Sequence, residues 1–268
     1  MDILEHIEKN YELYIKIPND FVKALNKILE FSNCSQVKIV QLSNCTINGK
    51  KIRGLINHPV SSIELQEIVS FCQAIKLPAE LGLKLVELAG YGIDIFDVSN
   101  FEHLHGLFIA DSDSDSDLPD FESLKKCYQK IKGTNDLSEA LRYAKEWSRK
   151  SLGDISYNMT AYKSKTSKNL SKIDKDTYKP QLSKMFKDSS TLRFSSLLRL
   201  CICMNLPPEI SFAIFGLSAY SRKFQYACKE NFIYKYVLIH LYNNTESVRE
   251  VIEPKSENDE PSQNRKRK

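Results

Sequence analysis

The sequence predicts an all-α protein built from two tandem multi-helix modules and a disordered C-terminal tail. Only nine glycines and nine prolines occur in 268 residues, and runs of alternating β-branched residues are few, which favours helices over sheets. Apolar residues recur at three- and four-residue spacing along most of the chain, as they do in helices with one buried face. In addition, residues 61–91 recur as residues 190–220, which is 129 positions later.

The repeated stretch predicts two helices joined by a tight corner. Ser61 followed by Glu64 is a capping-box start. Pro78 opens the second helix where a missing N–H costs little, and Gly90 ends it. Identical residues stand at the offset of 129 in the pairs Ser61/Ser190, Cys72/Cys201, Leu77/Leu206, Pro78/Pro207, Glu80/Glu209, Leu88/Leu217 and Tyr91/Tyr220. Because the proline corner and the buried positions both recur, we interpret the chain as two copies of one helical unit.

Caps and apolar spacing place the other helices of the first module, which we expect to cover residues 1–131. Asn19 or Asp20 caps the second helix, Ser35 begins the third and Asn48 caps the fourth. The expected helices begin near residues 3, 20, 35, 48, 61, 78, 100 and 121.

The second module is expected to cover residues 132–252, with helices that begin near residues 137, 152, 166, 179, 190, 207, 230 and 245. Its third helix is short, starts at Thr166 and carries Leu170. From residue 253 to residue 268 the chain is polar and unpatterned and ends in four basic residues, which predicts a disordered basic tail.

The second copy resembles a known family. In residues 166–170 a threonine precedes a buried leucine by four positions, and residues 181–206 read QLSKMFKDSSTLRFSSLLRLCICMNL. These segments are similar to helix two, and to the recognition helix, loop and fourth helix, of the Cro/lambda-repressor type of helix-turn-helix, also called the XRE type. LVELAGY at residues 85–91 resembles an extension found in many such proteins of Gram-positive bacteria.

The first copy resembles the same family at residues 35–39 and 48–56. The family has a glycine in the turn between helix two and the recognition helix, where this sequence has Thr46 and Asp176. The resemblance implies a DNA-binding transcriptional regulator. The alternative is a protein-interaction module built on degenerate helix-turn-helix repeats that no longer read DNA.

A recognition helix presents polar and cationic side chains from its first turns to the major groove. The candidate DNA-binding residues are Asn48, Lys50, Lys51 and Arg53 in the first copy, and Lys168, Tyr178, Lys179, Gln181, Ser183, Lys184 and Lys187 in the second. The expected partner is double-stranded DNA, with a protein partner or a homodimer left open. Two such helices either straddle neighbouring major grooves, roughly 34 Å apart, or only one of them reads DNA.

Other chemistry has weaker signals. Asp111, Asp113, Asp115 and Glu122 have the spacing of calcium ligands in an EF-hand, but Ser116 stands where the loop needs glycine. An acidic linker is the other interpretation of this segment. The histidines have neither metal-site nor triad spacing, and nucleotide-loop and hydrolase motifs are absent. We therefore expect a protein that is not an enzyme and needs no cofactor or metal.

Cysteine usage and hydropathy bear on location. The seven cysteines contain no CxxC pair, which suits a reducing cytoplasm. The first residues carry acidic side chains instead of an apolar core, and no run approaches the roughly 20 apolar residues of a membrane helix. A cytoplasmic protein without a membrane segment is expected. The net charge of +4 permits a polyanionic partner without requiring one.

Overall fold

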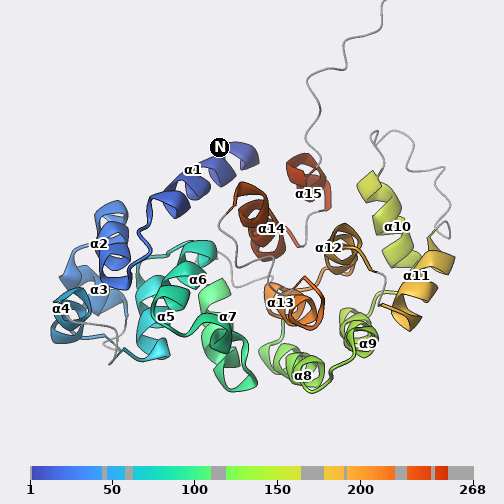
Figure 1. The fold of residues 1–268 in the computed structure, drawn as a ribbon, viewed down its shortest axis with the longest axis horizontal. Helices are drawn as coiled ribbons and strands as arrows, with labels where there is room; N and C mark the ends of the chain where they lie inside the picture. Colours follow the sequence, from blue (N-terminus) through green and yellow to red (C-terminus); the bar gives the residue numbers. More distant parts are fainter. Residues whose placement is uncertain are drawn as a thin grey trace, which may run out of the picture.

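The computed structural model describes residues 2–43, 47–57, 63–109, 119–163, 178–189, 192–220, 228–242 and 245–252. Over these ranges the regular structure is helical and contains no strand (Figure 1). The all-α prediction is therefore confirmed. Within the same ranges, none of the helices has the length and apolar character needed to cross a bilayer.

The N-terminal half, residues 2–109, follows the predicted order of helices. Asp20 and Ser35 accept hydrogen bonds from backbone N–H groups in the first turns of α2 and α3, as expected for caps. Its elements are α1 (Ile3–Lys16), α2 (Phe21–Ser32), α3 (Gln36–Leu42), α4 (Gly49–Asn57), α5 (Leu65–Ala74), α6 (Ala79–Leu88), the 3-10 helices η1 (Gly92–Phe96) and η2 (Val98–Asn100), and α7 (Phe101–Phe108).

The C-terminal half, residues 119–252, also follows the predicted order where it is described. Its elements are α8 (Phe121–Lys132), α9 (Leu137–Ser148), α10 (Leu152–Lys163), α11 (Lys179–Lys187), α12 (Phe194–Cys203), α13 (Pro208–Leu217), α14 (Lys229–His240) and α15 (Thr245–Ile252). The helix expected at Thr166, the acidic run 111–117 and the tail 253–268 lie outside the described residues.

The corner between α5 and α6 is present, with a shifted start. Helix α5 begins at Leu65 because Glu64 acts as its N-cap and Glu67 completes the capping box. The expected cap at Ser61 lies outside the described residues. Lys76 takes a left-handed conformation with φ of 50° in the corner, and Pro78 becomes the N-cap of α6.

The corner between α12 and α13 has the same geometry at an offset of 129 residues. Asn205 there has φ of 54°, and it stands where Lys76 stands in the first corner. The Tyr91 hydroxyl donates to the Ile63 carbonyl over 2.6 Å, and the Tyr220 hydroxyl donates to the Leu192 carbonyl over 3.1 Å. Both tyrosines thus tie the end of the second helix to the chain before the first.

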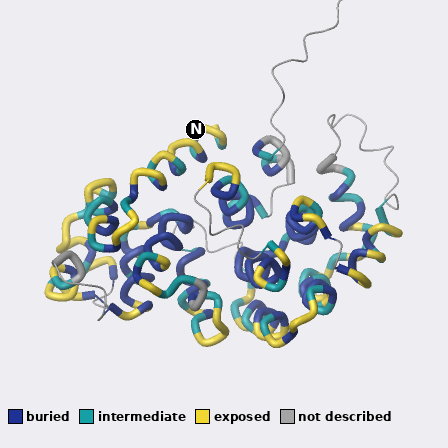
Figure 2. Tube along the Cα trace, viewed as in Figure 1, coloured by how far each residue is buried: buried dark blue, intermediate teal, exposed yellow. Residues whose placement is uncertain are grey.

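The two halves share their core. Buried apolar side chains form one cluster that runs through both halves, and buried segments fill the centre of the molecule (Figure 2). At the contact between the halves, the Phe212 ring of α13 stacks with the rings of Phe96 and Phe108. Helix α1 reaches across to α14, where Tyr14 packs on Phe232.

Helix α8 packs on α9 and α13, although the predicted boundary between the modules follows it. The Tyr128 hydroxyl of α8 also donates to the Phe96 carbonyl at the end of η1. This helix therefore joins the two halves. The module boundary at residues 131 and 132 stays a prediction.

Candidate nucleic-acid interface

The two helices that carry most of the candidate DNA-binding residues, α4 and α11, lie far apart. Figure 1 shows them at opposite ends of the long axis of the molecule, with α6, α7, α13 and α14 between them. They do not form one continuous surface. The two ends are therefore two separate candidate DNA contacts.

At the α4 end, two of the candidate residues serve the helix itself. Asn48 is the N-cap, and its Oδ1 accepts a hydrogen bond of 2.8 Å from the Lys51 backbone N–H. The Arg53 Nε donates to the Gly49 carbonyl over 3.1 Å while its side chain stays exposed. Lys50 is exposed as well.

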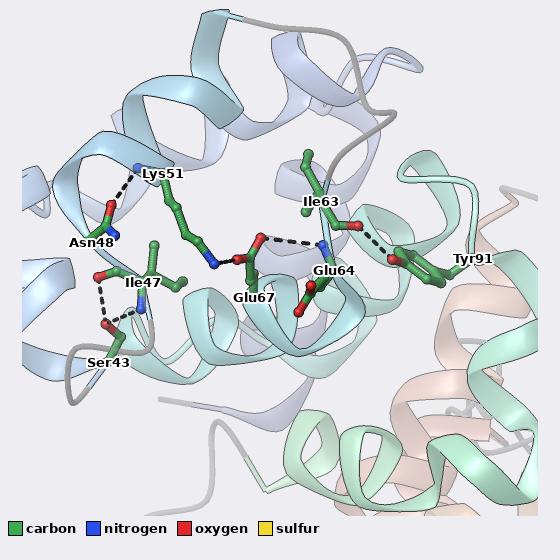
Figure 3. A network of polar contacts seen from close by, with 8 residues as sticks. All are labelled: Ser43, Ile47, Asn48, Lys51, Ile63, Glu64, Glu67 and Tyr91. Carbon is green, nitrogen blue, oxygen red and sulfur yellow. Dashed lines mark hydrogen bonds and ion pairs between the residues drawn. The ribbon is translucent and has the colours of Figure 1, made fainter.

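Lys51 points toward α5 and forms an ion pair with Glu67 (Figure 3). The Glu67 side chain is only 7% exposed, and its second oxygen accepts from the Glu64 backbone N–H over 3.4 Å. The hydrogen bond that Lys51 donates to Glu67, followed by the charge of Glu67, raises the pKa of Lys51. Lys51 therefore links α4 to α5 although its side chain stays 48% exposed, and Lys50 and Arg53 are further exposed cations of α4.

At the α11 end, the helix is fixed by an apolar face. Its buried side chains are Leu182, Met185 and Phe186, and the Tyr178 backbone N–H donates to the Ser156 Oγ of α10 over 2.9 Å.

The opposite face of α11 is exposed and polar. Gln181, Lys184 and Lys187 follow one another at three-residue spacing, so they lie along one side of the helix. Lys179 and Ser183 are half-buried. Lys168 lies outside the described residues.

A hollow of about 380 Å³ separates the start of α12 from the exposed side of α11. Lys184 and Arg193 bring two positive charges to it, and Asp188 brings one negative charge. The lining residues are Gln181, Lys184, Met185, Asp188, Leu192, Arg193 and Ser196.

In the N-terminal half, the Lys51–Glu67 ion pair occupies the position equivalent to this hollow. At the offset of 130 that relates α4 to α11, Lys51 corresponds to Gln181. At the offset of 129 that relates α5 to α12, Glu67 corresponds to Ser196. Gln181 and Ser196 line the hollow, whereas Lys51 and Glu67 bridge their two helices. The two ends thus differ where their sequences differ.

The helix expected at Thr166, which is helix two of the second copy, lies outside the described residues and stays a prediction. Helix α10, which was expected from residue 152, packs on α11 and α12.

Metal and thiol chemistry find no support among the described residues, which contain no group of three or more His, Cys, Asp or Glu side chains arranged to hold a metal ion. Residues 111–118 of the candidate calcium loop lie outside that part of the chain, and Glu122 is exposed on α8. Burial raises the pKa of the Cys72, Cys201 and Cys203 thiols to about 12, so these cysteines behave as apolar core residues.

Two buried carboxylates between the halves were missed by the sequence interpretation. The Glu80 Oε1 lies 2.9 Å from the His240 Nε2, and the Glu209 Oε1 lies 2.6 Å from the His105 Nδ1. The identity of Glu80 and Glu209 in the repeat was the available signal. Their partners are remote in sequence, so spacing rules did not reveal them.

No family model, curated protein or solved structure matches this chain.

Proposed function

We propose that this protein is a DNA-binding transcriptional regulator that contacts double-stranded DNA through the exposed face of α11. The observation that carries the proposal is the contrast between the two ends. Lys184 and Arg193 face an open hollow beside α11, whereas Lys51 is held by Glu67 beside α4. Exposed cations along one helix face suit phosphate contacts, and an exposed glutamine is able to pair with adenine.

The repeated features support the interpretation of the chain as two copies of one helical unit. The corner residues in left-handed conformation and the tyrosine hydrogen bonds recur at one offset. In this interpretation the N-terminal half is the first copy of the module, and α4 has become a structural helix with a smaller share of DNA contact.

A second candidate function for the N-terminal half is binding of another protein. Val37 and Leu42 of α3 are 68% and 50% exposed, and Phe31 at the end of α2 is 38% exposed. Apolar side chains at these positions gain more from a protein partner than from phosphates.

Binding of random-sequence duplex DNA, measured against salt concentration, tests the proposal. Log affinity is expected to fall linearly with log salt, with a slope of about −0.9 for each phosphate contacted. Lys184→Glu is expected to weaken binding at every sequence and to make the slope shallower by about 1.

Lys50→Glu is the matched control, because it makes the same charge change on the exposed face of α4. We expect it to have a much smaller effect than Lys184→Glu. Absence of measurable binding at low salt would refute DNA binding. An equal loss from both variants would contradict the assignment of the contact to α11 alone.

A further inference from the structure

Two Glu–His pairs join the halves of the molecule at buried positions. Glu80 on α6 pairs with His240 at the end of α14, and Glu209 on α13 pairs with His105 on α7. The whole residues Glu80 and Glu209 are 0% and 2% exposed. Each pair therefore links one half to the other through a buried charge.

The arrangement is reciprocal. Glu80 and Glu209 occupy the same position in the repeat, 129 residues apart. Each reaches into the other half, to the helix that follows the partner corner. Helix α6 packs on α14, and α13 packs on α7. The two pairs thus act on the same contact from its two sides.

The first pair has both charged and aromatic neighbours. Next to Glu80, Lys235 of α14 is 7% exposed, and Lys84 of α6 donates to the carbonyls of Tyr14 and Ile17 over 2.8 and 2.9 Å. Burial lowers the pKa of both lysines, and the charge of Glu87 opposes that lowering. The His240 ring packs on the ring of Tyr236, which also packs on the ring of His6.

Around the second pair, His105 packs on the rings of Phe101 and Phe121. Burial raises the pKa of Tyr128 on α8, and the charge of Glu209 raises it further. Lys125 of α8 pairs with Glu102 of α7 nearby and lies over the Phe121 ring. A carboxylate in such a place needs a positive partner, because a buried unpaired charge is costly.

We propose that the two Glu–His pairs form a proton-operated clamp between the halves, closed while the imidazoles are protonated and weakened when they lose their protons to solvent. A neutral imidazole still offers one N–H, but it no longer neutralises the carboxylate. Glu80 keeps Lys235 nearby, so the pair of Glu209 and His105 is expected to be the more sensitive one. Opening changes how the α4 and α11 ends are held relative to each other.

The clamp is also expected to weaken at low pH, where the carboxylates become protonated. Burial, the largest single influence, would raise the pKa of Glu80, but the charge and hydrogen bond of His240, a backbone hydrogen bond and the charge of Lys235 together lower that pKa below its usual value. The contribution of Glu80 is therefore present above the usual carboxyl range and is lost as pH falls through the lowered pKa. Histidine is the side chain whose charge change falls nearest neutral pH, so pH 6 and pH 8 are the two conditions at which the clamp is compared.

Hydrogen exchange of the full chain at pH 6 and pH 8, corrected for the intrinsic exchange rates, tests the clamp. Amide protection in α7, α13 and α14 is expected to fall several-fold at pH 8, while protection in α4, which packs on α2 and α3, stays constant. The unaltered protein suffices for this measurement. Equal protection at both pH values would overturn the proposal.

Variants identify the groups responsible. His105→Gln and His240→Gln are each expected to lower the pH 6 protection toward the pH 8 value, and the double variant is expected to abolish the pH dependence. Glu209→Gln removes the buried charge and is expected to reduce the pH dependence of protection as well. His103→Gln on the same helix α7 is the matched control and should keep the full pH dependence. Retention of that dependence in the double histidine variant would refute the clamp.

Discussion

At the scale of single residues, two tyrosine hydroxyls hold equivalent corners of the fold. The Tyr91 and Tyr220 hydroxyls donate to the carbonyls of Ile63 and Leu192, which immediately precede the caps of α5 and α12. Each of these carbonyls loses its hydrogen bond from the tyrosine when the hydroxyl is removed. Both residues are half-buried, so water compensates only in part.

Tyr91→Phe and Tyr220→Phe are each expected to lower the free energy of unfolding by about 1 kcal/mol, since each removes one hydrogen bond and keeps the ring. Urea denaturation followed by circular dichroism gives this quantity. Similar losses at both sites are expected because the contact is the same. A loss at one site alone would contradict an equivalent role for the two tyrosines.

At the scale of elements, the packing of α6 on α7 depends on Gly82. A Cβ atom at this position would lie 2.5 Å from the Leu107 Cδ1 and 3.3 Å from its Cγ. Leu107 is fully buried, so it has little room to move. The two helices approach closely because residue 82 has no side chain.

Gly82→Ala is expected to destabilise the protein by about 1 to 2 kcal/mol, since overpacking exceeds the gain in helix propensity. Gly216→Ala in α13 is the matched control: nothing lies within 4 Å of its Cβ position, so it is expected to stabilise by about 0.5 to 1 kcal/mol. Thermal unfolding of both variants measures the two effects. A stabilising Gly82→Ala would show that α6 and α7 separate easily.

Elements were also what the sequence predicted best. Caps such as Asp20 and Ser35, the proline corner and the apolar faces of α5 and α11 are local signals, and each found its place. Pairing across the chain was not predictable in this way. The Lys51–Glu67 bridge and both Glu–His pairs depend on which helices meet, and periodicity within a helix does not contain that information.

At the scale of the whole molecule, the halves are interlocked. Helix α1 of the N-terminal half packs on α14 and α15, α8 packs beside η2, and Phe212 stacks between Phe96 and Phe108. The shared core runs through both halves. A perturbation deep in one half should therefore be felt in the other, so that the chain unfolds in one cooperative transition.

The only tryptophan, Trp147 on α9, makes this testable, because its fluorescence reports on the C-terminal half. Leu25→Ala empties a position of α2 in the N-terminal half that is 1% exposed, and is expected to cost about 2 to 5 kcal/mol. If the halves unfold together, the Trp147 transition and the circular dichroism transition fall by the same amount. Leu4→Ala, at a position of α1 that is 43% exposed, is the control and should move neither. A Trp147 transition that stays in place while the dichroism becomes biphasic would mean that the halves unfold independently, and their contact would then be too weak to carry a clamp.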